Sequence, residues 1–279
     1  MKFQYLGTAA AEGFPAVFCN CEYCQEAWKL GGKNFRTRSQ SIINDELLMD
    51  FPPDTMAHIH AQRIRGDKIK YIVFTHSHAD HYYSTDLMRH GSYYAHNMAE
   101  EKLVIVCSEQ LCERMQKDLS NLKKDVILEY HVAKPFIPME LGEYTLIPFP
   151  ARHSGDSEGK LALFYAIKHE GKTILYAHDT GFFFDEVFDY IKENRLYFDM
   201  ISLDCTNAHL NSKPNANHMG LNSDAEVLER LREMGAVDEK TLCYVNHFSH
   251  NGNPLHEVLS ESAAKVGFKV SYDGLKLEV

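Results

Sequence analysis

The chain has 279 residues, of which 39 are acidic and 29 basic, and its net charge is −10 at pH 7. This acidic balance argues against long nucleic acid as a partner, because such binders carry a basic patch or arm. No apolar stretch reaches the roughly 20 residues of a membrane helix, and residues 1–7 are too short and strand-like for a signal peptide. We therefore expect a cytoplasmic protein with no membrane partner.

The first half of the chain is rich in short apolar runs bounded by polar residues, which is typical of β-strands. We expect strands at residues 2–7, 41–44, 46–50, 69–74, 103–107 and 126–132. The spacing of apolar residues predicts two helices between them, at residues 54–65 and 109–121.

The second half begins with strands and then alternates strands with helices. Strands are expected at 144–149, 161–168, 173–177, 200–203, 242–245, 269–271 and 275–279, and helices at 185–194, 224–234 and 254–266. Ser223 and Glu226 match a capping box, so we expect the second of these helices to begin after Ser223. This order favours two sheets with helices on their outer faces, in one α/β domain that spans residues 1–279.

Four side chains that can bind metal follow the apolar run at residues 71–74: His76, His78, Asp80 and His81. Residues two apart at the end of a strand project the same way, so the first two can share one ion. The other two come after the chain has turned and can reach a second ion. Imidazole with carboxylate suits zinc, iron and manganese. The alternative, a histidine-rich surface loop, fits poorly with four ligand types directly after a buried strand.

The pattern His-x-His-x-Asp-His resembles the signature of the metallo-β-lactamase superfamily, and the resemblance continues along nearly the whole chain. It implies a four-layer αβ/βα sandwich with a binuclear metal site between the sheets, in which Asp50 braces the metal loop. Three later positions match the family's order: His153 after a strand, Asp179 at a strand end, and the late His247. The resemblance thus assigns His76, His78 and His153 to one ion, Asp80, His81 and His247 to the other, and Asp179 to both.

Two further histidines lie close to these positions in the sequence. His178 precedes Asp179, but neighbouring strand residues face opposite sides of a sheet, so we expect His178 to be a core or supporting residue. His209, in the loop 207–211, could line the rim of the site. The other histidines lack ligand spacing and are interpreted as structural or surface residues.

Three of the seven cysteines lie within six residues, as Cys19, Cys21 and Cys24. An odd number of cysteines in a cytoplasmic chain argues against a disulfide framework. The three could be incidental buried thiols, a redox cluster or part of a structural zinc site, which needs a fourth ligand. His250 offers one, because it follows His247 by three residues and can turn away from the catalytic metals.

The cysteines, together with Gly7-Thr8-Ala9, the run at 36–39 and His247-x-x-His250, resemble the PhnP-like phosphodiesterases of the carbon–phosphorus lyase pathway. That resemblance implies a structural zinc at residues 19–24 and His250, and an active-site pair of manganese or zinc ions. It also implies a catalytic role for His218, for which a loop-capping role is the alternative. Arg36 and Arg38 could bind a single phosphate or form structural ion pairs.

Together these patterns predict a binuclear metal-dependent hydrolase that cleaves small or cyclic phosphodiesters through a hydroxide between the ions, with Asp80 and His218 as catalytic residues. Rival enzymes with these ligands are thioesterases and transfer-RNA-processing nucleases. A rival of another class is a non-catalytic metal-binding accessory or carrier protein of cofactor biosynthesis. Such relatives commonly lose part of the ligand set, which is complete here. The expected partner is a small phosphodiester substrate, and a homodimer is left open.

Overall fold

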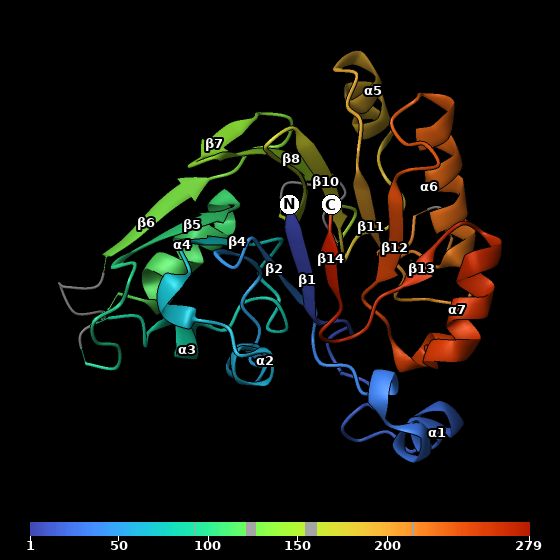
Figure 1. Cartoon of the computed structure of the whole chain (residues 1–279), viewed down its shortest axis with the longest axis horizontal. Helices are drawn as coiled ribbons and strands as arrows, with labels where there is room; N and C mark the ends of the chain where they lie inside the picture. The colour runs from blue at the N-terminus through green and yellow to red at the C-terminus, as the bar shows by residue number, and fades with distance from the viewer. Residues whose placement is uncertain (92, 121–126, 154–160, 214) are drawn as a thin grey trace.

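The computed structural model (Figure 1) describes residues 1–91, 93–120, 127–153, 161–213 and 215–279. Its strands form two seven-stranded sheets. The first has the order β14 (Lys276–Glu278), β1 (Lys2–Gly7), β2 (Gln40–Ile43), β3 (Leu47–Met49), β4 (Tyr71–Val73), β5 (Lys102–Cys107) and β6 (Ile127–Val132). The second has the order β13 (Lys269–Val270), β12 (Leu242–Asn246), β11 (Met200–Asp204), β10 (Lys172–Ala177), β9 (Leu163–His169), β8 (Tyr144–Pro150) and β7 (Met139–Leu141).

Helices cover the outer faces of both sheets, as Figure 1 shows. The first sheet carries α2 (Thr55–Gln62), α3 (Ser84–Leu87) and α4 (Glu109–Asp118), and the second carries α5 (Asp185–Glu193), α6 (Leu221–Glu233) and α7 (His256–Lys265). The helix α1 (Glu22–Leu30) lies apart from these, at the lower end of the sandwich in Figure 1. This arrangement confirms the predicted four-layer αβ/βα sandwich. None of the helices in the described ranges is long and apolar enough to cross a membrane.

The apolar side chains form a layer between the sheets and one layer outside each sheet. The inner layer combines aliphatic and aromatic residues, and among the latter Tyr5 and Tyr176 are fully buried. The outer layers lie under the helices, with Ile72 in the first sheet and Ile201 in the second. Each sheet therefore packs apolar side chains on both faces, and the polar groups of a site lie at the ends of the strands.

Parallel pairing decides where those polar groups meet. Strands β3, β4, β5 and β6 are parallel, as are β10, β11, β12 and β13. The carboxyl ends of neighbouring parallel strands lie at the same edge of a sheet, which is where ligands bind in open α/β sheets. The two sheets thus present their strand ends, and the loops that follow them, along one side of the sandwich.

The structure corrects three sequence-based expectations. The predicted loop around Cys24 continues as the helix α1, and the short strand β7 was not predicted. The helix α6 begins at Leu221 rather than after Ser223, and the Ser223 hydroxyl accepts a hydrogen bond from the Gly220 N–H, so this serine lies inside the first turn. Residues 121–126 lie outside the described part, which leaves the predicted helix end at 121 and strand start at 126 untested.

Candidate metal centre

The polar side chains that follow the strands converge at the edge where the carboxyl ends meet. Asp50 follows β3, Asp179 comes two residues after β10, and His247 follows β12. All three have left-handed backbone conformations, with φ of 63°, 55° and 67°. Such conformations are uncommon outside glycine and cluster at functional sites. Here each one turns the chain sharply at a strand end and directs a ligand-type side chain toward the same point.

Asp179 lies at the middle of the predicted ligand set. Its Oδ2 lies 3.2 Å from His76 Nε2, 3.1 Å from His81 Nε2 and 3.7 Å from His247 Nε2, and its Oδ1 lies 3.1 Å from His153 Nδ1. Ligands bound to one ion at about 2.1 Å lie roughly 3.0–3.4 Å apart, so most of these separations fit neighbours in a coordination shell. They form two groups that share Asp179, namely His76, His78 and His153, and Asp80, His81 and His247. This division matches the one that the family resemblance implies.

Several polar atoms in this cluster are buried and lack hydrogen bonds. Within the described residues, His76 Nε2, His81 Nε2, His247 Nε2 and Asp179 Oδ1 have no hydrogen-bond partner. Leaving one such atom unpaired costs about 1–3 kcal/mol, and four of them face one another here. Divalent cations would satisfy all four, so the donor set fits a metal site.

The protonation states of His76 and Asp179 also suit metal binding. Burial lowers the pKa of His76 to about 3, with neighbouring His81 adding to the effect, so this imidazole is neutral. Burial by itself would raise the pKa of Asp179, but the surrounding histidines, His247 first, lower it well below its usual range. A neutral imidazole and an ionised carboxylate are the forms that bind divalent metals.

Asp50 holds one of the ligands in place, as predicted. Its Oδ2 lies 2.8 Å from His81 Nδ1, and its Oδ1 accepts a hydrogen bond of 2.7 Å from the Thr75 N–H. A hydrogen bond from Nδ1 fixes the tautomer and leaves Nε2 free for an ion. Asp50 therefore orients the loop that carries the histidine signature.

The sequence analysis missed a second supporting carboxylate, Asp204. It lies 3.4 Å from His247 Nδ1 and 3.3 Å from His218 Nδ1. Both of its oxygens already accept hydrogen bonds, from the Thr206 N–H and hydroxyl and from the Met219 N–H. The signal was present, because Asp204 ends an apolar strand just as Asp50 follows one, but the predicted strand stopped one residue short of it.

The other histidines near the site differ in position. His178 is fully buried, with Nε2 2.6 Å from the Ser202 hydroxyl and Nδ1 3.1 Å from the Asn246 amide nitrogen, which confirms it as a core residue. His218 precedes α6 and places Nδ1 3.2 Å from Asp179 Oδ1. His209 is exposed and is absent from the residues that line the cavity over the site, so the expectation that it forms the rim is wrong.

A cavity of about 460 Å³ opens over the cluster. Its walls combine the ligand-type residues with short polar side chains and small residues. The lining residues are Ala10, Ala11, Glu12, His78, Asp80, His153, Asp179, Thr206, Asn207, His218, His247, Ser249, His250 and Asn251.

Arg36 and Arg38 do not reach this cavity. The Arg36 guanidinium is buried and donates to the Ser271 carbonyl at 2.6 Å and to the Thr8 hydroxyl at 3.0 Å. Arg38 donates to the Ala11 carbonyl and pairs with Asp54. Both arginines are therefore structural, Arg38 through an ion pair and Arg36 through hydrogen bonds.

The four residues of the predicted cysteine site also lie close together. The Sγ atoms of Cys19, Cys21 and Cys24 and a ring nitrogen of His250 lie within 4.8 Å of one another. His250 Nδ1 is 3.4 Å from Cys19 Sγ and 3.5 Å from Cys21 Sγ, close to the roughly 3.5–3.8 Å between ligands of tetrahedral zinc. Burial opposes ionisation of Cys21, but the Cys24 N–H and His250 lower its pKa to about 6. All seven cysteines are free, so no disulfide competes for these sulfurs.

Residues 46–245 match a family model described as the beta-lactamase superfamily domain. Coenzyme PQQ synthesis protein B of Acinetobacter baylyi is 25% identical, and the alignment covers 100% of both chains. A diphosphatase from the PhnP family has a similar structure, with a TM-score of 0.72 at 21% identity over 100% of this chain and 97% of that one. Zn²⁺-bound PqqB from Methylobacterium extorquens gives a TM-score of 0.73 at 16% identity, with 100% of both chains covered. The chain therefore belongs to the metallo-β-lactamase superfamily and resembles the PhnP family within it.

Proposed function

We propose that the chain is a binuclear metal-dependent hydrolase that cleaves small phosphodiesters, including cyclic ribose or nucleotide phosphates. The completeness of the ligand set supports this most directly, because the six other predicted side chains surround Asp179 beside an open cavity. We assign one ion to His76, His78 and His153, the other to Asp80, His81 and His247, and a bridging position to Asp179.

Two divalent ions bound here would activate a water molecule and offset the charge of a phosphodiester. The chain's own residues hold and orient that machinery, because Asp50 fixes the tautomer of His81. The Thr206 hydroxyl, which donates to Asp204, lies 2.7 Å from His247 Nδ1 and orients that ring. The described residues that line the cavity include neither lysine nor arginine. The charge of the phosphate would therefore be met by ions and histidines rather than by basic side chains.

His218 is the residue that we propose to act on the substrate. Its side chain is 29% exposed and lines the cavity, while Nδ1 faces Asp179 and Asp204. Nε2 lies on the opposite side of the ring, where it can hold a proton for the leaving oxygen. His218 is also close enough to Asp179, Asp204 and His247 to be a metal ligand itself. We favour the first role because Asp204 already accepts three hydrogen bonds and needs no ion.

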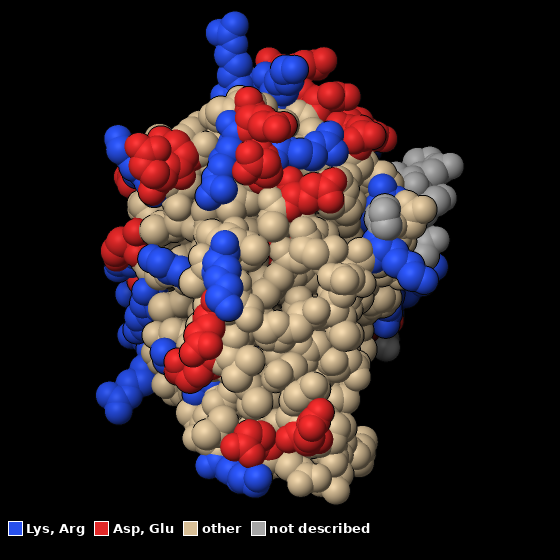
Figure 2. All heavy atoms as spheres, turned by 90° about the vertical axis from the view of Figure 1, so that its right-hand side faces the viewer, with Lys and Arg blue, Asp and Glu red and all other residues tan. Residues whose placement is uncertain are grey.

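The surface charge supports a small substrate rather than RNA. The net charge is −10, and the described residues on the face shown in Figure 2 mix lysine and arginine with acidic side chains, without a continuous basic track. Binding of a long polyanion depends on many phosphate contacts by basic residues. A single phosphodiester does not need such a series of contacts with basic residues.

We further propose a structural zinc at Cys19, Cys21, Cys24 and His250, which makes about three ions per chain with the active-site pair. Three thiolates and one imidazole close the coordination sphere of zinc and leave no position for substrate. The free state of all seven cysteines supports a cytoplasmic location, where thiols stay reduced.

A second candidate is a non-catalytic metal-binding accessory or carrier protein of cofactor biosynthesis. The observation that favours it is the alignment with Coenzyme PQQ synthesis protein B over the full length of both chains. We place it second because a carrier needs a binding cavity, but has no need of a complete set of seven metal ligands.

The test is a hydrolysis screen on protein loaded with Mn²⁺ or Zn²⁺. The substrates are a 2′,3′-cyclic nucleotide, bis(p-nitrophenyl) phosphate, a glutathione thioester and precursor transfer RNA, with Asp80→Ala as the blank for contaminating hydrolases. We expect turnover of the two small diesters and loss of it in Asp80→Ala. Salt-sensitive cleavage of RNA alone would indicate a nuclease. No turnover of any substrate by fully loaded protein would favour the accessory role.

A further inference from the structure

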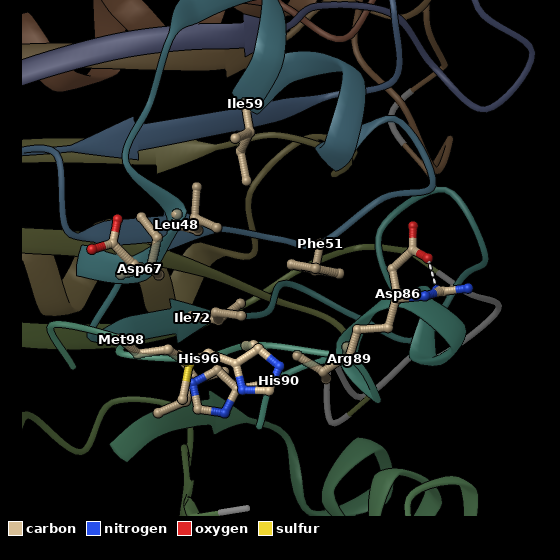
Figure 3. A pocket seen from close by; sticks show the side chains of 15 residues that line it. Leu48, Phe51, Ile59, Asp67, Ile72, Asp86, Arg89, His90, His96 and Met98 are labelled. Carbon is tan, nitrogen blue, oxygen red and sulfur yellow. Dashed lines mark hydrogen bonds and ion pairs between the residues drawn. The ribbon is translucent and has the colours of Figure 1, made fainter. Parts of the chain in front are cut away.

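A second hollow lies on the outer face of the first sheet, away from the metal centre (Figure 3). Its floor is made by Leu48 on β3, Ile72 on β4 and Leu103 on β5, and Ile59 on α2 forms one wall. Residues that follow α3, among them His90 and Met98, form another wall. The hollow encloses about 290 Å³ and shares no lining residue with the cavity over the metal centre.

The charged groups that line this hollow already have partners. The Asp67 carboxylate accepts two hydrogen bonds of 2.7 Å from Arg65, and the Arg89 guanidinium pairs with Asp86, as Figure 3 shows. An ionic ligand would have to break these pairs or lie unpaired against an apolar floor, and both are unfavourable. A ligand that fits the hollow is therefore uncharged.

One polar atom in the hollow is left without a partner. His90 Nδ1 is buried and makes no hydrogen bond within the described residues, although the His90 N–H donates to the Leu87 carbonyl. Figure 3 shows the His90 and His96 rings beside Met98 at one end of the hollow, with Ile59 at the other. A buried polar atom of this kind is satisfied by a water molecule or by a ligand group.

We propose that this hollow binds an uncharged bicyclic aromatic molecule that carries one N–H or O–H group. An apolar cavity of about 150 Å³ holds benzene, so about twice that volume accommodates two fused rings. The apolar floor contacts the rings, and the N–H or O–H meets His90 Nδ1. Small-molecule sites commonly have this composition, with apolar walls and few polar groups.

The hollow also touches the segment that braces the loop with the histidine signature. Phe51 lines the hollow and directly follows Asp50, and its N–H donates to the His81 carbonyl at 2.8 Å. A bound molecule would thus contact a residue adjacent to the carboxylate that orients His81. This site is independent of the proposed hydrolysis, and its test needs no turnover.

The test uses the full-length chain, supplemented with Zn²⁺ and labelled at isoleucine and methionine methyl groups for NMR. Indole and indene are the probes, because they have the same shape and differ in one N–H. We expect saturable shifts of the Ile59, Ile72 and Met98 methyls, with Ile174 and Ile201 of the second sheet unchanged. Indole should bind about fivefold more tightly than indene, as one added hydrogen bond allows.

Three variants separate this site from unspecific binding. Ala95→Phe places a ring in the hollow and should abolish the shifts, whereas Ala99→Phe, on the same segment but exposed and outside the lining, should leave them unchanged. His90→Phe should bind both probes with equal affinity. Shifts that persist in Ala95→Phe, that map to the second sheet, or that never saturate would overturn the proposal.

Discussion

The chain gathers ligand-type side chains in two clusters that are built in opposite ways. The central cluster collects residues from strand ends of both sheets, far apart in the sequence, and the fully buried core of the sandwich positions them. The cysteine cluster takes three residues from one short segment, and its own apolar core is small, made of Phe14, Ala16, Cys24 and Ala27. The first site is therefore held by the fold, whereas the proposed zinc would hold the fold around the second.

One short segment joins the two clusters. His247 faces Asp179, and His250, three residues later, faces the cysteines. Between them, Phe248 donates its N–H to the Thr8 carbonyl and accepts from the Ala10 N–H, each at 3.0 Å. These bonds fasten the N-terminal loop to the segment that carries His247 and His250, and His250 also lines the cavity over the central cluster.

The largest effect that separates the clusters is expected from Asp179→Asn. Because Asp179 contacts ligands of both ions, its loss should remove the active-site pair and lower turnover at least about a thousandfold. Elemental analysis should find about one ion per chain, the cysteine-bound zinc, against about three in the parent. Asp185→Asn, at an exposed ion pair on α5, is the control. A variant that keeps three ions and normal turnover would refute the bridging role.

The next effect concerns His218→Gln. If His218 supplies a proton, its loss should slow hydrolysis of a cyclic nucleotide about a hundredfold, but slow bis(p-nitrophenyl) phosphate only slightly, because an activated leaving group needs no proton. Steady-state kinetics on the two substrates measures this ratio. His209→Gln, in an exposed loop nearby, should change neither. Equal losses on both substrates would instead indicate phosphate binding, and no loss would return His218 to a loop-capping role.

A smaller effect is expected from Asp204→Asn. The carboxylate accepts from the Thr206 hydroxyl, which lies 2.7 Å from His247 Nδ1, and loss of such a supporting partner typically weakens metal binding about tenfold or more. Zinc titration against a competing chelator measures the affinity. Asp199→Asn, at the opposite end of the same strand and paired with Lys172, should bind zinc like the parent. If both variants titrate alike, Asp204 serves the fold rather than the metal.

The residues of the central cluster differ in how readily they could be predicted from the sequence. His76, His78, Asp80 and His81 were found from spacing alone, because all four follow one apolar strand. The later ligands came from the order of motifs in a known family, since a lone residue such as Asp179 has no local pattern. Asp204 was missed because the predicted strand stopped one residue short of it. The helix α1 was missed because its buried face is too short to show a helical period, and no sequence pattern indicates the hollow at the first sheet, whose lining comes from separate segments.

Cys21→Ser is expected to have the smallest effect on catalysis, although its effect on stability should be large. Losing one thiolate should release the structural zinc, and the loss of a few kcal/mol would lower the melting temperature by roughly 10 °C in a chain of this size. Turnover per active-site pair should stay within about threefold of the parent at a temperature where both are folded, because none of the cysteines lines the cavity. Cys243→Ser, at a half-buried free thiol on β12, controls for the loss of a cysteine as such.

A Cys21 variant that keeps its zinc and melts like the parent would remove the structural assignment. A folded variant that keeps its active-site ions yet loses turnover would show that the cysteine cluster influences catalysis through the segment from His247 to His250, in addition to stabilising the fold.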